Sequence, residues 1–89
     1  MAKVVIVHDV EDVDTWLKGK AERADAIGGM GGTNVVDHVA QDGSTTIAIT
    51  ADVQDVDAVL AEIESPPAEL LATMQRHGVV PPLKVFVQR

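Results

Sequence analysis

The residues of this chain that are best suited to chemistry lie near its start, where His8 ends an apolar run and the single tryptophan, Trp16, follows. Alternate side chains of a strand share a face, so His8 is predicted to point to the same side as Val4 and Ile6. A neutral imidazole there can transfer a proton near pH 7 or hold a ligand oxygen. The alternative is a structural histidine that bonds the next loop or caps the next helix. The spacing of Trp16 from the other apolar residues predicts a core residue of a helix, and the alternative is a residue that lines a pocket.

The other histidines give little support to a metal site. His77 is predicted to close the last helix, where an imidazolium interacts favourably with the helix dipole. His38 lies within a predicted strand beside Asp37, and adjacent strand residues face opposite ways, whereas ligands carried by one strand need to share a face. The chain has no cysteine, which removes thiolate ligands and thiol mechanisms. We therefore expect no metal and no cofactor.

Composition narrows the classes of function. The chain has 89 residues, which we expect to form one domain over 1–89, and a formal net charge of −7. Nucleic-acid binding needs clustered basic side chains and stacking aromatics, but Trp16 and Phe86 are the only aromatic residues. The first apolar run, Val4 to Val7, is too short for a membrane span or a signal peptide. We expect a cytoplasmic protein with no nucleic-acid or membrane partner.

Residues 3–17 are predicted to form a buried strand that leads into a helix. The strand is apolar at both parities, which is typical of a strand covered on both faces. Asp12 is a suitable N-cap, and the glycine-rich segment 28–32 ends the helix. A phosphate loop would lead from a strand into a helix, so these glycines indicate a plain connection. The predicted apolar stripe of the helix, with Lys20 at its margin, is Val13, Trp16, Leu17, Lys20, Ala21, Ala24 and Ile27.

A hairpin is predicted in the middle of the chain, because Asp42-Gly43 separates two β-rich runs, 34–40 and 45–51. In the second run the isoleucines share one face, and the small residues Ala48 and Thr50 take the other. Small residues favour either close approach of another layer or space left for a ligand.

Two helices and a strand are predicted to complete the chain. Asp52 is expected to cap the first helix, which Ser65-Pro66-Pro67 terminates. The second covers about 68–77, with Met74 on its apolar face, and a final strand covers 83–88 after Pro81-Pro82.

This βαββαβ order predicts an α+β, ferredoxin-like fold, with an antiparallel sheet and the helices on one face. The valines of the first and last strands, among them Val5, Val7, Val85 and Val87, then leave apolar side chains on the uncovered face. A bare apolar face is a liability for a monomer. Packing two such sheets face to face buries it, so we expect a homodimer through the open sheet face, forming a dimeric α/β barrel.

Two stretches resemble a known family. Residues 8–16, His-Asp-Val-Glu-Asp-Val-Asp-Thr-Trp, resemble the His-x-Val-x-Asp-Tyr-Asp-x-Trp stretch of small bacterial dimeric α+β barrel proteins. These are related to the antibiotic-biosynthesis monooxygenase and stress-responsive barrel groups. Residues 69–82 are similar to the closing helix and Gly-Val-x-x-Pro-Pro run of the same proteins. The chain departs from the pattern at Val13, where the family has tyrosine, and in its longer Ser65-Pro66-Pro67 segment.

The resemblance implies a pocket between helices and sheet, with His8 as acid/base and Asn34 polarising a substrate oxygen. It implies a small organic ligand, bound by Trp16, Ala48, Thr50 and Met74. We expect a cofactor-independent monooxygenase, cyclase or isomerase that acts on a small apolar metabolite. The alternative is a non-catalytic metabolite-binding or assembly domain, because fold does not fix function.

Overall fold

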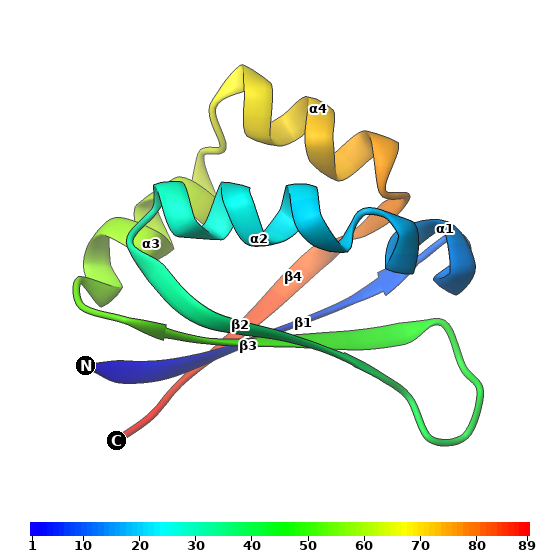
Figure 1. Ribbon diagram of the computed structural model, residues 1–89, viewed down its shortest axis with the longest axis horizontal. Helices are drawn as coiled ribbons and strands as arrows, with labels where there is room; N and C mark the ends of the chain where they lie inside the picture. Colours follow the sequence, from blue (N-terminus) through cyan, green and yellow to red (C-terminus); the bar gives the residue numbers. More distant parts are fainter.

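A four-stranded antiparallel sheet forms one layer of the molecule, and helices cover one of its faces (Figure 1). The computed structural model describes residues 1–89. The strands are β1 (Ala2–Val10), β2 (Gly32–Val39), β3 (Thr46–Val53) and β4 (Val79–Val87), in the sheet order β2-β3-β1-β4. The helices are α1 (Val13–Lys18), α2 (Lys20–Gly29), α3 (Val56–Glu64) and α4 (Ala68–Arg76). This confirms the predicted ferredoxin-like α+β fold. None of the helices is long and apolar enough to cross a membrane.

The hydrophobic core lies between β1, β3 and the helices. β1 is central because it pairs with β3 on one side and with β4 on the other. Val4, Ile6 and His8 all face the helices and are at most 5% exposed, which confirms the predicted orientation of His8. The core-facing residues of β3 are Ile47, Ile49, Ala51 and Val53.

The predicted first helix is divided at Gly19 into α1 and α2. It begins as expected, because Asp12 accepts a hydrogen bond from the Thr15 N–H at 3.2 Å. At Gly19 there is no room for a side chain, since a Cβ would lie 2.6 Å from Cδ2 of the His77 ring. The division shifts the buried face of α2 to Arg23 and Ile27. The predicted stripe is therefore wrong at Lys20 and Ala21, which are exposed, because it assumed one continuous helix, whereas Ile27 is buried as predicted.

Two predicted boundaries are also corrected. β3 continues to Val53, so Asp52 is a strand residue, whose Oδ1 lies 3.0 Å from Nζ of Lys3. Asp55 caps α3 instead and accepts from the Ala58 N–H at 3.1 Å. β4 begins at Val79, before the two prolines at 81–82, which an edge strand tolerates because one side of it needs no ladder hydrogen bonds.

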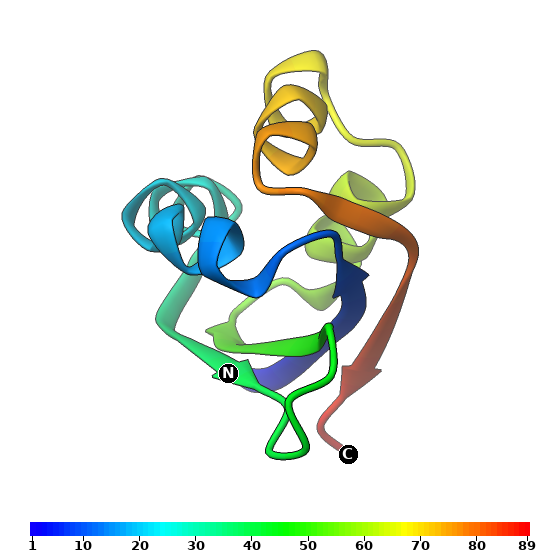
Figure 2. The same ribbon diagram turned by 90° about the vertical axis from the view of Figure 1, so that its right-hand side faces the viewer.

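No helix covers the second face of the sheet (Figures 1 and 2). Phe86 pairs with Val5 across β4 and β1 and is 56% exposed, and Val36 on β2 is 42% exposed. Val85 and Val87 instead pack against the core, so among the residues of β4 that follow the two prolines Phe86 is the apolar one on the open face. His38 is exposed on the same face, where it pairs with Ala48.

Candidate functional site

A mostly apolar pocket of about 70 Å³ lies between the helix layer and the sheet. Strands β1 and β3 contribute Ile6, His8 and Ile49 to its lining, α2 and its C-cap contribute Ala26, Ile27 and Met30, and α4 contributes Leu70 and Met74. Its four polar lining residues are His8, Arg23, Thr73 and His77. Any polar chemistry in this pocket therefore depends on two imidazoles, one guanidinium and one hydroxyl.

His8 lines this pocket and has one ring nitrogen without a hydrogen-bond partner. Its Nδ1 lies 2.9 Å from the carbonyl oxygen of Asp9, which can only accept, so Nδ1 carries the proton. Nε2 is then a lone-pair acceptor, and it makes no hydrogen bond within the chain. Burial lowers the pKa of His8 below its ordinary value of 6.5; the hydrogen bond to Asp9 opposes this shift, and the charge of Arg23 adds to it. His8 is consequently a neutral base at pH 7.

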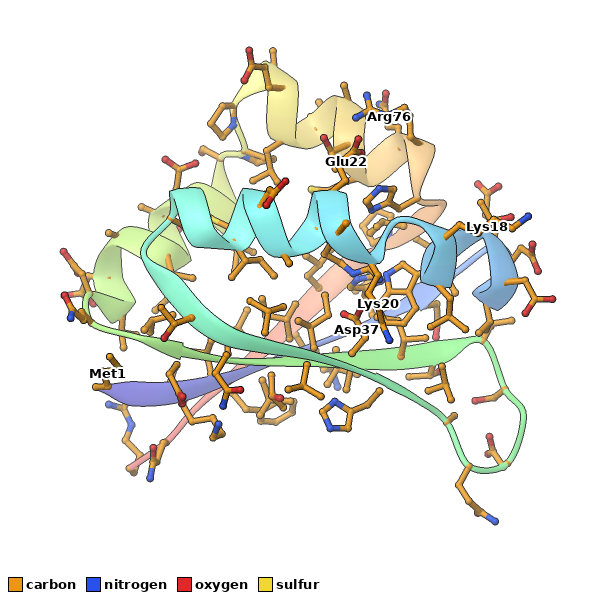
Figure 3. The ribbon with its side chains drawn as sticks, in the orientation of Figure 1. Met1, Lys18, Lys20, Glu22, Asp37 and Arg76 are labelled. Atoms are coloured by element: carbon orange, nitrogen blue, oxygen red, sulfur yellow. The ribbon has the colours of Figure 1, made fainter.

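A buried ion pair lies beside the pocket. Arg23 donates to both carboxylate oxygens of Asp37, from Nε at 3.1 Å and from Nη2 at 2.9 Å. The two side chains are 7% and 3% exposed. Figure 3 shows Asp37 on the helix side of the sheet, beneath α2. The guanidinium also lies 4.0 Å from the ring centroid of Trp16 and donates from Nη1 to the Trp16 carbonyl at 2.9 Å. Arg23 thus ties α2 to β2 and α1.

His77 connects this ion pair to the surface. A guanidinium only donates, so Nδ1 of His77 is the acceptor of the 3.3 Å bond from Nη1 of Arg23. Nε2 therefore carries the proton and donates to Oε1 of Glu22 at 3.0 Å. Arg76 also donates to Oε1 of Glu22, at 2.7 Å, and Figure 3 shows these two side chains meeting between α2 and α4. Both His77 nitrogens are occupied, which leaves His8 as the pocket imidazole with a free one.

The pKa values of His77 and Glu22 both lie below their ordinary values. Burial lowers the pKa of His77, and the Arg23 charge adds to that effect. The hydrogen bond from Arg76 lowers the pKa of the exposed Glu22 carboxyl. At pH 7 the carboxylate is therefore charged and the imidazole neutral, as the bonding pattern requires.

The structure brings only two of the predicted site residues together. His8 and Met74 both line the pocket. Trp16 is fully buried and does not line it, so its position is that of a core residue; its Nε1 has no hydrogen-bond partner.

The other three predicted site residues lie elsewhere. Ala48 and Thr50 face the uncovered side of the sheet, because the isoleucines of β3 take the helix side. Asn34 lies where β2 begins, near the far end of the sheet from His8. Its Nδ2 donates to Oδ2 of Asp52 at 3.4 Å. The structure therefore does not bring Asn34 to His8.

Sequence reasoning missed Arg23, Asp37 and Glu22, and gave His77 only a helix-end role. One signal was available: Asp37 shares strand parity with Val35 and Val39, which were candidates for the helix-facing side. A carboxylate in a core-facing position needs a buried cation. No group of three or more histidine, aspartate or glutamate side chains is placed to hold a metal ion.

No protein-family model matches this chain, and no curated protein matches it by sequence. Its fold does resemble solved structures. A candidate antibiotic biosynthesis monooxygenase from Bordetella bronchiseptica superposes with a TM-score of 0.76 at 13% identity, over 99% of this chain and 94% of the other. SnoaB, a cofactor-independent oxygenase from Streptomyces nogalater, gives a TM-score of 0.68 at 16% identity, over 99% and 92%.

A dimeric ferredoxin-like protein from an uncultured marine organism gives a TM-score of 0.52 at 15% identity, over 97% of this chain and 92% of the other. At sequence identities this low, the similarity is evidence for a shared fold and not for a shared reaction. The similarity agrees with the resemblance noted in residues 8–16 and 69–82. The chain therefore has the same ferredoxin-like α+β fold as these antibiotic biosynthesis monooxygenase-like structures.

Proposed function

We propose that this chain binds a small apolar metabolite and acts on it without a bound cofactor, with His8 as the acid/base. The observation that carries the proposal is the free Nε2 of His8 beside an apolar pocket. The fold similarity to a cofactor-independent oxygenase supports the same class of chemistry. Of the residues predicted for catalysis, His8 alone is retained in the proposal.

The step available to His8 is proton removal. Nε2 accepts a proton from an acidic O–H or C–H of the ligand, which forms an imidazolium and a ligand anion. The Nδ1 bond to the Asp9 carbonyl fixes the tautomer and the ring orientation. Arg23 lines the same pocket and favours the anion electrostatically. Reprotonation of the anion at another atom is an isomerisation, attack on an internal carbonyl is a cyclisation, and reaction with O₂ is an oxygenation.

Replacing His8 with asparagine tests this role. The asparagine amide can retain the bond to the Asp9 carbonyl, but it removes the basic Nε2. Turnover is expected to fall by about 10²–10⁴-fold, the usual range for loss of a general base. Product formation and oxygen uptake would be measured on a panel of fused-ring phenols and lactones. In the unsubstituted protein, activity should be constant above about pH 6.5 and decline below it, because a base with a lowered pKa protonates only in acid.

His38→Asn is the matched control, since His38 is exposed on the opposite face of the sheet. It should leave turnover unchanged. Full activity in the His8→Asn protein, with its fold intact, would exclude His8 as the base.

A non-catalytic metabolite-binding or assembly domain is the second candidate. It is favoured by the absence of a second free acid/base group in the pocket, because both nitrogens of His77 are bonded and Asn34 is distant. Native mass spectrometry of protein from its own host separates the candidates. A tightly held small molecule recovered chemically unchanged supports binding without turnover.

The homodimer through the open sheet face is part of the same proposal. Phe86→Glu would place a charge on that apolar face. Burying an unpaired carboxylate costs several kcal/mol, so we expect the dimer dissociation constant to rise by about 100-fold or more. Light scattering and sedimentation velocity would measure it. Leu71→Glu is the control, because Leu71 is 44% exposed on α4, away from this face, and should leave the dimer intact. A Phe86→Glu protein that dimerises like the unsubstituted chain would exclude this interface.

A further inference from the structure

We propose that α4 is a lid, anchored at its C-terminal end by His77, over a chamber that takes an elongated apolar molecule. The inference rests on the proposed ligand pocket and extends it, since it says how a ligand larger than the pocket enters. It follows from the packing of α4, from the hollows on both of its sides, and from the distribution of its hydrogen bonds.

α4 packs more loosely than the other helices. Buried residues are found in α1, α2 and α3, whereas α4 has none. Leu70, Thr73 and Met74 are half-buried on its lower face, and Leu71 is exposed. Figures 1 and 2 both show α4 farther from the sheet than α2 or α3. Little apolar burial therefore holds this helix in place.

Hollows flank α4 on both sides. One, of about 300 Å³, lies toward α2 and shares Leu70 and Thr73 of α4 with the His8 pocket. The other, of about 620 Å³, lies toward α3 and β4 and shares Met74 with it. Half-buried α4 side chains thus form walls between the central pocket and larger spaces. If α4 lifts, these spaces join.

The polar attachments of α4 are confined to its C-terminal end. Arg76 and His77 bond Glu22 and Arg23, and the Gly78 carbonyl accepts from the Glu11 N–H at 2.9 Å. No hydrogen bond joins residues 66–75 to another element. The N-terminal end, after the two prolines at 66–67, also lacks a side-chain cap. The helix is therefore free to lift from that end while His77 remains in its site.

The size of the closed pocket requires such a motion. Sites for organic ligands usually measure about 300–1,000 Å³, several times the 70 Å³ of the closed pocket. Most of the exposed lining of the α3-side hollow is apolar, from residues such as Leu60, Leu71 and Val85. The chamber thus fits an elongated apolar molecule that reaches His8 at one end and lies under α4 along its length.

Hydrogen exchange of the ligand-free protein tests the lid directly. A nine-residue helix without packing is only marginally stable in water, so lifting α4 exposes its amides. We expect α4 amides to exchange at least about tenfold faster than those of α2 and of the central strands. His77→Ala should accelerate exchange in α4 by a further tenfold or more. Exchange in β1 and β3 should change little beyond any change in the free energy of global unfolding. Protection of α4 equal to that of α2 would overturn the lid.

Gln75→Ala is the matched control, because Gln75 is exposed on the same helix. It should leave the exchange of α4 as it is. If His77→Ala fails to fold, Glu22→Gln weakens the same anchor from the α2 side and should give an intermediate acceleration in α4. An equal effect of Gln75→Ala and the anchor variants would overturn the role of His77.

The neutral apolar probe N-phenyl-1-naphthylamine tests the chamber. Its fluorescence should rise on binding, and the bound probe should slow exchange in α4. Failure to bind, or protection confined to the open sheet face, would overturn the chamber. The two proposals can fail separately. If exchange shows that α4 opens but the His8→Asn protein remains fully active, the lid is retained and the catalytic role of His8 is excluded.

Discussion

Replacing Asp37 with alanine is expected to lower the free energy of unfolding by about 3–5 kcal/mol, the usual cost of removing one partner from a buried ion pair. The guanidinium of Arg23 would remain in the core without its bidentate carboxylate, and it would keep only its bonds to Trp16 and His77. Small domains have about 5–15 kcal/mol of stability in total. Urea unfolding followed by circular dichroism, at one protein concentration, would measure the loss.

The double variant Arg23→Met/Asp37→Leu separates two contributions to the free energy of unfolding. One is the cost of leaving Arg23 buried without a partner, and the other is the net contribution of the ion pair. Replacing a whole buried pair with apolar residues of similar size is often neutral or stabilising. The double variant should therefore be clearly more stable than Asp37→Ala. A loss below about 1 kcal/mol in the single variant would mean that water reaches Arg23, contrary to its burial.

The fold could be predicted from sequence because its signals are local and repeated. Strand parity placed His8 among the core residues of β1, and Asp42-Gly43 located the hairpin. Asp12 gave the start of the first helix. Each of these features depends only on residues that are close together in the sequence, so each could be predicted without knowing how the other elements pack.

The candidate site was less predictable because its determinants join distant segments. At Gly19, where the first helix is divided, the ring of His77 from far along the chain leaves no room for a side chain. The division turns Arg23 toward the core. No periodicity within residues 13–29 contains that information. Similarly, parity separated Ala48 and Thr50 from the isoleucines of β3 correctly, but it did not say which face holds the pocket.

Replacing Trp16 with alanine should also cost about 3–5 kcal/mol, because Trp16 is fully buried and its loss leaves a large cavity. It would remove the ring that lies against Arg23 as well. Since Trp16 is the only tryptophan, unfolding must be followed by circular dichroism rather than by intrinsic fluorescence.

Trp16→Phe distinguishes a core role from a pocket role. The indole Nε1 is buried without a partner, so its removal forfeits no hydrogen bond and offsets part of the lost packing. We expect Trp16→Phe to retain more than half of the stability that Trp16→Ala loses, and to bind N-phenyl-1-naphthylamine as the unsubstituted protein does. Gln75→Ala, at an exposed position of α4, is the control, and it should change the free energy of unfolding by less than about 0.5 kcal/mol. A stable Trp16→Phe protein with probe affinity reduced tenfold would instead make Trp16 a wall of the ligand site.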